Sequence, residues 1–259
     1  MRHLRNAAAT VVPPLVAAAV LLMVWQTVSA TGIVDPSVLP APSHVAGQGI
    51  GQWDVLIRHT APTLAATVLG FILSITVAFV VASALDFSGT LRGAILPLLI
   101  VGQTLPLIAL APLVVLWFGF GLLPKVLLVA FVTFFPMVVG LMRGFASADS
   151  DAQYLLRSMG AGRVRVFRTI RLPASMPSFF SALRISITYA VVGAVFAEYA
   201  GAVSGLGVYM QSAKNVFRTD LVLAAVAVSS VLTLLLYLLV VLIERAALPW
   251  HRIDVGERT

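Results

Sequence analysis

The sequence of 259 residues contains no cysteine and little charge. Without cysteine it can form neither a disulfide framework nor a thiolate metal site. Charged residues make up 10% of the chain, against about 25% in an ordinary soluble domain. Apolar residues make up 60%, and the mean hydropathy is +1.02, which leaves too few polar side chains to cover a water-soluble surface. The composition excludes a soluble enzyme, a disordered tail and a secreted disulfide scaffold, and it predicts an all-α integral membrane protein.

Recognisable catalytic and metal-binding motifs are also missing. The chain has no G-x-x-x-x-G-K-[ST] motif, and neither Lys125 nor Lys214 follows a glycine-rich loop, so the chain cannot hold ATP phosphates by itself. It has no H-E-x-x-H motif and no carboxylate cage. Histidine occurs only at four scattered positions, which are His3, His44, His59 and His251. We therefore expect no enzyme active site, no metal site and no cofactor bound by this chain.

Six apolar stretches are long enough to cross a membrane, which takes about 20 residues of helix. They predict helices near residues 9–29, 61–84, 94–118, 124–145, 176–201 and 221–243. The third stretch contains Pro97, Pro106 and Pro112, so we expect one kinked or tilted span there. The first stretch could instead be a cleaved signal peptide, but its apolar run exceeds the usual core of about 7–15 residues.

Positive charge is the dominant ionic feature, with a net formal charge of +7. Nucleic-acid binding would gather basic residues on a soluble face, whereas here they lie between apolar runs, so no nucleic-acid partner is expected. With a cytoplasmic N-terminus and six crossings, the outer side holds only Arg58, Lys125, Lys214 and Arg218. The inner side holds Arg2, Arg5, Arg92, Arg143, Arg157, Arg163, Arg165, Arg168, Arg171, Arg184, Arg245, Arg252 and Arg258. This bias predicts that both termini are cytoplasmic.

One inner segment, residues 147–174, carries five arginines among apolar residues at helical spacing. Gly160-Ala161-Gly162 interrupts that spacing, so we expect two short amphipathic helices joined by a glycine turn. Leu172-Pro173 then leads into the fifth span. A polybasic helix lying on anionic lipid would account for the charge. A rigid hairpin that docks into a groove of a soluble partner would also account for the glycine break and the proline.

This segment resembles the cytoplasmic coupling loop, or EAA loop, of permease subunits in bacterial ABC importers, whose pattern is E-A-A-x3-G-x9-I-x-L-P. Gly160, Ile170 and Leu172-Pro173 are in register with that pattern, whereas Tyr154-Leu155-Leu156 replace Glu-Ala-Ala. The resemblance implies that the loop contacts a partner ATPase. The implied coupling residues are Tyr154, Leu155, Arg157, Gly160, Ala161, Arg163, Ile170, Leu172 and Pro173.

The rest of the chain resembles the nitrate, sulfonate, taurine and thiamine-precursor group of these permeases. The resemblance rests on the stretches 38–43, 105–113 and 117–119, and on Glu244-Arg245 followed by Leu248-Pro249-Trp250. It implies the type I importer fold, with residues 1–259 as a single transmembrane domain in the bacterial plasma (inner) membrane. It also implies a second, usually identical, permease copy, a cytoplasmic ATPase that binds ATP and Mg²⁺, and a periplasmic or lipid-anchored solute-binding protein. Membrane lipid surrounds such a subunit.

Three polar residues within the spans are candidates for the substrate path. Glu198 is the only acid inside a predicted span, and such residues are costly in a membrane. Gln103 and Thr104 lie beside Pro106 in the middle of a span. Hydrogen bonding between helices would also account for Gln103 and Thr104, and hydrogen bonding to a neighbouring helix or to water would account for Glu198.

The substrate is suggested by residues 187–199 and 205–210, which look most like permeases for the pyrimidine precursor of thiamine, a hydroxymethylpyrimidine-like compound. Sulfonates, taurine and nitrate are the alternatives. Two other kinds of protein stay open. An ion-coupled secondary transporter would need its own coupling site at mid-membrane, often with repeated halves, and a membrane scaffold would need only the basic loop.

Overall fold

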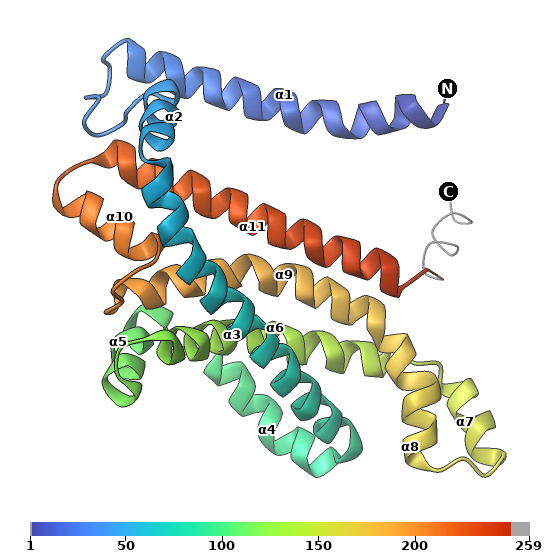
Figure 1. Cartoon of the computed structure of the whole chain (residues 1–259). Helices are drawn as coiled ribbons and strands as arrows, with labels where there is room; N and C mark the ends of the chain where they lie inside the picture. Colours follow the sequence, from blue (N-terminus) through green and yellow to red (C-terminus); the bar gives the residue numbers. More distant parts are fainter. Residues whose placement is uncertain (1, 250–259) are drawn as a thin grey trace. The chain divides into compact units, whose positions relative to one another are not determined.

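The structure is a computed structural model that describes residues 2–249, and every regular element within this range is helical (Figure 1). Trp250, His251, Arg252 and Arg258 lie outside the described residues. The elements are α1 (Arg2–Ala30), α2 (Pro42–Gly51), α3 (Trp53–Phe87), α4 (Gly89–Gly102), α5 (Leu107–Phe118), α6 (Leu122–Ala146), α7 (Ser150–Ser158), α8 (Arg163–Val166), the π-helical turn η1 (Phe167–Arg171), α9 (Leu172–Tyr199), α10 (Leu206–Asn215) and α11 (Thr219–Ala247).

Five helices in the described range are long and apolar enough to cross a membrane, at Val12–Ala30, Trp53–Phe87, Leu122–Ala146, Arg163–Tyr199 and Thr219–Ala247. They confirm five of the six predicted spans. The span at Arg163–Tyr199 starts earlier than the predicted residue 176, because α8, η1 and α9 follow one another without a break.

The remaining predicted span, residues 94–118, was expected as one kinked or tilted helix, and instead the chain breaks there into two helices, which form a broken span or a re-entrant loop. It consists of α4 and α5, which are bent by 101° at a break of a few residues. Pro97 and Pro112 lie inside α4 and α5 without interrupting them, whereas Pro106 stands at the break as the N-cap of α5. Proline disfavours helical geometry in the residue before it, here Leu105, which favours a break at this point.

The chain divides into two compact units, of which the first comprises residues 1–59 and 209–228. Within it, the end of α1 is tied to the loop before α2. The Trp25 indole donates a hydrogen bond to the carbonyl of Pro40 (3.1 Å), and the Ser29 hydroxyl donates one to the carbonyl of Leu39 (2.8 Å). These two hydrogen bonds satisfy backbone carbonyls of the loop before α2, which lie outside any helix.

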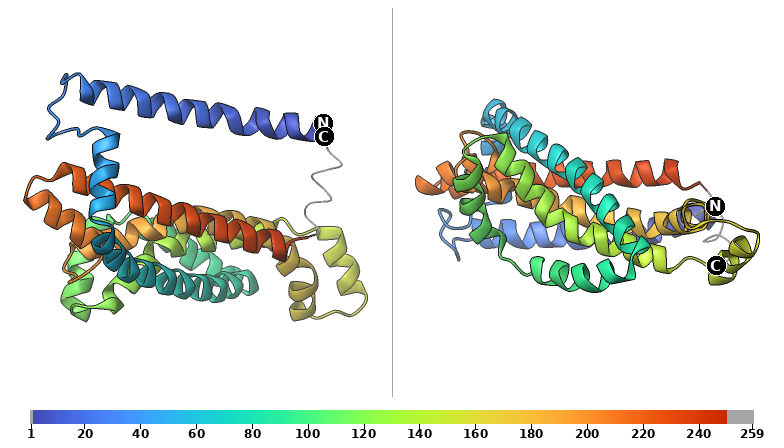
Figure 2. Two further views of the ribbon diagram at one scale, coloured as in Figure 1. Left: turned by 45° about the horizontal axis from the view of Figure 1, so that its top comes forward. Right: turned by 90° about the horizontal axis from the view of Figure 1, so that it is seen from below.

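The second unit comprises residues 60–208 and 229–259 and is organised around α6 and α9, which pack side by side (Figures 1 and 2). Their backbones approach closely because small residues face each other. A Cβ on Gly140 would overlap Ala182, and one on Gly144 would lie 2.7 Å from the Cα of Ser175. Such contacts between small residues are the usual basis of helix packing in lipid. Lipid tails are as apolar as the side chains, so moving a side chain from lipid into a helix interface gives little hydrophobic stabilisation.

Candidate functional site

The predicted hairpin at residues 147–174 is confirmed in outline. Helix α7 and the segment α8–η1 project beyond the ends of α6 and α9 (Figures 1 and 2). Asp149 caps α7 by accepting a hydrogen bond from the N–H of Asp151 (2.8 Å). Gly160, at φ +83°, ends the helix in a left-handed conformation that favours glycine. The Gly160 and Ala161 N–H groups donate to the carbonyls of Arg157 (2.9 Å) and Leu156 (3.1 Å), which closes the turn.

The second arm of the hairpin differs from the prediction of a separate short helix. It passes through the π-helical turn η1 directly into α9. In an unbroken α-helix the ring of Pro173 would clash with the carbonyl of Thr169. A π-helical turn widens the backbone at that point, so the helix continues past the proline. The hairpin is therefore a continuous extension of the fifth span.

The tip of the hairpin exposes apolar side chains. Tyr154, Leu155, Met159 and Val164 are each more than half exposed in the chain as it stands. Contiguous exposed apolar surface of this kind marks a contact site for another molecule. Arg157 and Arg163 are exposed beside these residues.

An ion pair fixes the base of the hairpin to the end of α3. Nη1 of Arg171 lies 2.7 Å and 2.6 Å from the two carboxylate oxygens of Asp86, and Nε of Arg171 donates to the side-chain carbonyl of Gln153 (3.1 Å). The Asp86 side chain is only 7% exposed. One guanidinium thus joins α3, α7 and η1, and a charge-assisted contact of this length is strong.

Aromatic packing reinforces this junction. The ring of Phe167 on η1 lies 5.1 Å from that of Phe87 on α3 and 5.2 Å from that of Phe145 on α6. Sequence reasoning missed Asp86, which lies 85 residues from Arg171. A signal was present, because Asp86 is the only acidic residue between Asp54 and Asp149.

The three predicted path residues do not come together. Gln103 and Thr104 are exposed at the break between α4 and α5, where the Thr104 hydroxyl donates to the carbonyl of Val101 (2.7 Å). Glu198, by contrast, is 1% exposed near the end of α9. The polar pair and the carboxylate are therefore separate features.

The Glu198 carboxylate holds the start of α10 against α9. It accepts hydrogen bonds from the Thr63 hydroxyl (2.8 Å) and the Gly207 N–H (2.8 Å), and the Nζ of Lys125 lies 3.8 Å from its Oε1. Thr63 in turn accepts a bond from the N–H of Leu206 (2.9 Å). The carboxylate is therefore fully engaged by groups from α3, α6 and α10.

Two further contacts bring the turn before α10 close to the Glu198 carboxylate. Lys125 Nζ also donates to the carbonyl of Ser204 (2.9 Å), and its side chain is 8% exposed. A Cβ on Gly205, at φ +142°, would overlap the Glu198 carboxyl group. Sequence reasoning placed Lys125 only among the outer charges. Because the partners lie 73 residues apart in the sequence, no local pattern joins them.

No group of three or more histidine, aspartate or glutamate side chains that could hold a metal ion occurs within the described part of the chain.

Comparison with known proteins gives the family. Residues 70–248 match the model of the binding-protein-dependent transport system inner membrane component. The chain belongs to this family. This permease is 34% identical to a probable ABC transporter permease protein of Haemophilus influenzae, over 86% of the chain and 91% of the relative. It is 33% identical to the formylaminopyrimidine transport permease protein ThiX of Halalkalibacterium halodurans (90% and 93% covered) and 32% identical to the taurine transport system permease protein TauC of Escherichia coli (90% and 87%).

A solved structure shares the fold. The inward-facing methionine ABC transporter MetNI covers 76% of the permease and aligns over 97% of its own chain, with a TM-score of 0.67 and 18% identity. The predicted all-α fold of ABC importer permeases is confirmed, and so is the prediction of a multi-span permease of the inner membrane. Neither an ion-coupled secondary transporter nor a scaffold is favoured by this family membership.

Proposed function

We propose that the permease is the membrane half of an ATP-driven importer and that residues 147–174 dock on a cytoplasmic ATPase. The exposed apolar tip of the hairpin is the observation that supports this most directly. Arg157 and Arg163 stand beside it and suit acidic residues of the partner surface. The docking residues we propose are Tyr154, Leu155, Arg157, Gly160, Ala161, Arg163, Ile170, Leu172 and Pro173. ATP and Mg²⁺ bind the ATPase, and this chain binds no cofactor.

The hairpin is suited to transmitting force because it does not end at a flexible joint. Its second arm continues into α9, and its base is held to α3 by the ion pair of Arg171 with Asp86. When the ATPases close, movement of the hairpin would tilt both helices together. The permease would thereby alternate between inward-facing and outward-facing states.

Two copies of this chain, each a single transmembrane domain over residues 1–259, form the translocation path in this proposal. Both termini lie in the cytoplasm, as the distribution of arginine favours. A periplasmic or lipid-anchored solute-binding protein delivers the solute to the outer face. Gln103 and Thr104 at the break between α4 and α5 line the path, since an interrupted helix leaves backbone groups free to meet a solute. Glu198 supports the outer end of this path by holding the turn before α10.

The solute we propose is a thiamine pyrimidine precursor, a hydroxymethylpyrimidine-like compound. The residues at 187–199 and 205–210 support it, as does the relative named for formylaminopyrimidine transport. The relative named for taurine transport is nearly as similar, so taurine and other sulfonates, with nitrate, are the second candidate. Uptake of hydroxymethylpyrimidine and of taurine into vesicles that hold the complete transporter separates the two. Taurine uptake without pyrimidine uptake would overturn the first choice.

The docking proposal is tested by two proline substitutions two residues apart. Gly160→Pro cannot adopt the φ of +83° found here, whereas Gly162→Pro fits the φ of −71° at its position. We expect Gly160→Pro to abolish copurification of the ATPase and Gly162→Pro to retain it, with equal amounts of both variants in the membrane. Retention of the ATPase by Gly160→Pro would contradict docking through this hairpin.

A further inference from the structure

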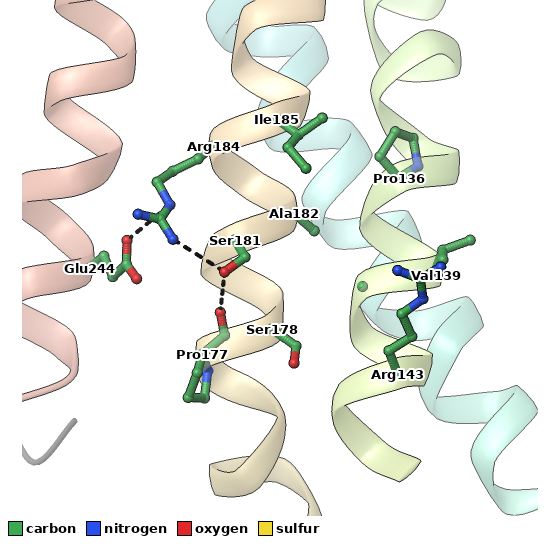
Figure 3. Close-up of a pocket in the computed structure, with 11 residues that line it drawn as sticks. Pro136, Val139, Arg143, Pro177, Ser178, Ser181, Ala182, Arg184, Ile185 and Glu244 are labelled. Carbon is green, nitrogen blue, oxygen red and sulfur yellow. Dashed lines mark hydrogen bonds and ion pairs between the residues drawn. The ribbon is translucent and has the colours of Figure 1, made fainter. Parts of the chain in front are cut away.

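A cavity of about 480 Å³ lies between α6, α9 and α11 in the second unit (Figure 3). Its size is within the range of ligand sites, about 300–1,000 Å³. Its lining is unusual for a membrane protein, because it combines two guanidinium groups, from Arg143 and Arg184, with the hydroxyl groups of Ser178 and Ser181. None of these four residues belongs to the docking hairpin, the helix break or the Glu198 network.

One arginine of the cavity is already fixed in place. Nε of Arg184 lies 3.4 Å from a carboxylate oxygen of Glu244 on α11, and its Nη2 donates to the Ser181 hydroxyl (3.2 Å) (Figure 3). The Ser181 hydroxyl donates to the carbonyl of Pro177 (3.0 Å). This chain of contacts orients the Arg184 guanidinium, so a ligand that used its remaining N–H groups would meet a rigid donor.

The other arginine is not engaged. Arg143 is exposed, and its guanidinium has no ion pair or hydrogen bond with any residue in the range 12–249. With Glu244 as the only carboxylate in the lining, the cavity holds two cations against one anion. The Arg143 guanidinium and the Ser178 hydroxyl, from the two helices that line this space, suit the oxygens of a tetrahedral anion, which guanidinium binds in bidentate fashion. Arg184 adds positive charge from the α11 side of α9, where it is held against Glu244 (Figure 3).

The cavity also lies where anionic headgroups are found. Arg143 is three residues from the end of α6, next to the segment 147–174. Basic pockets between transmembrane helices on the cytoplasmic side bind phospholipid headgroups. A single arginine at a helix end would be explained by membrane orientation alone. That explanation does not require a second guanidinium and two serines around one cavity.

We infer that this cavity is a binding site for one oxyanion group, either the phosphate of an inner-leaflet phospholipid or a small soluble anion of the phosphate or sulfonate type. The leaflet rests on the orientation in the proposed function, whereas anion binding does not. Nanodiscs expose both faces of the membrane, so the binding test below stands even if the orientation is wrong.

The lipid arm of the test uses the full chain in phosphatidylcholine nanodiscs titrated with phosphatidylglycerol, with bound lipid counted by native mass spectrometry. Arg143→Gln should weaken binding about tenfold, since it removes charge-assisted hydrogen bonds. Ser178→Leu should weaken it as well, because it fills the cavity while leaving both arginines. Arg92→Gln, which removes an exposed arginine of α4 outside the cavity, should bind as the wild type does.

The soluble arm uses the same discs without phosphatidylglycerol and measures binding of inorganic phosphate and of methanesulfonate by calorimetry. If Arg143→Gln and Ser178→Leu weaken phosphatidylglycerol binding, the ligand is the lipid. If they weaken only the soluble probes, it is a small anion. Size-exclusion profiles show whether each variant is folded. If one of the two variants does not fold, the other still tests the inference. Wild-type affinity of both folded variants for all three probes would overturn the inference.

Discussion

Glu198 and Lys125 show how a costly pair of charges is kept inside a membrane helix bundle. The carboxylate is 1% exposed and the lysine 7%, and every contact described for them comes from a different helix or from the turn before α10. A buried ion pair is weak evidence for net stability, but removal of one partner leaves an uncompensated charge. The two residues should therefore behave as a unit under mutation.

We predict that Lys125→Met destabilises the purified permease by about 3 kcal/mol, because it strands the Glu198 carboxylate. Glu198→Gln should cost less, since the amide keeps an acceptor for Thr63 and Gly207. In the double variant much of the loss should be recovered. Thermal unfolding in detergent measures all three, with exposed Lys214→Met as the matched control. Strictly additive losses in the double variant would show that the two charges are not coupled.

A second prediction concerns Gly205, beside the same carboxylate. Gly205→Ala should lower the thermal midpoint clearly, because its Cβ would overlap Glu198 and its φ of +142° disfavours any side chain. Gly93→Ala is the comparison, since a Cβ there meets nothing within 4 Å and the residue is helical. Equal midpoints for the two variants would mean that the turn relaxes freely around a new side chain.

At the residue scale, sequence could nominate Glu198 but not its partners. A lone acid in an apolar span is visible by composition alone. Thr63 and Lys125 become neighbours of Glu198 only through helix packing, and a sequence without aligned relatives carries no record of such contacts. The same is true of Asp86 and Arg171, which lie far apart in the chain.

At the scale of elements, the apolar runs located five spans because a helix is the way for one segment to satisfy its own backbone in lipid. At residues 94–118 the same rule located the apolar stretch but not the break that divides it into α4 and α5. Three prolines were visible there, yet only Pro106 interrupts the helix. Proline inside a helix is tolerated where neighbouring groups satisfy the freed carbonyl, so its effect depends on packing that the sequence does not display. The glycine turn at Gly160 was predicted because it is a local feature.

The junction of the hairpin with α3 yields a prediction for a pair of helical elements. Asp86→Arg and Arg171→Asp should each impair solute uptake while the ATPase still binds, because the hairpin tip is untouched. The charge-swapped double variant should regain part of the uptake, since the pair is restored in reverse. Arg168→Asp, which changes an exposed arginine in the same turn, is the control. If uptake by the double variant were no higher than uptake by the worse single variant, the ion pair would not couple the hairpin to α3.

At the scale of the whole molecule, composition alone established the class of protein, and family membership established its role as a permease. The side of the membrane on which each loop lies rests on the charge bias. Thirteen of the seventeen Lys and Arg residues fall on the proposed inner side. Basic residues are retained in the cytoplasm during insertion, so a bias of this size favours one orientation.

The absence of cysteine makes this orientation directly testable. We predict that Ala161→Cys, at the tip of the hairpin, reacts with a membrane-impermeant maleimide only after the cells are opened. Val203→Cys, where the native side chain is 91% exposed between α9 and α10, should react in intact cells. The unaltered chain has no thiol and supplies the blank. The reverse labelling pattern would place the hairpin outside the cell, where no ATPase could reach it, and docking through residues 147–174 would then be impossible.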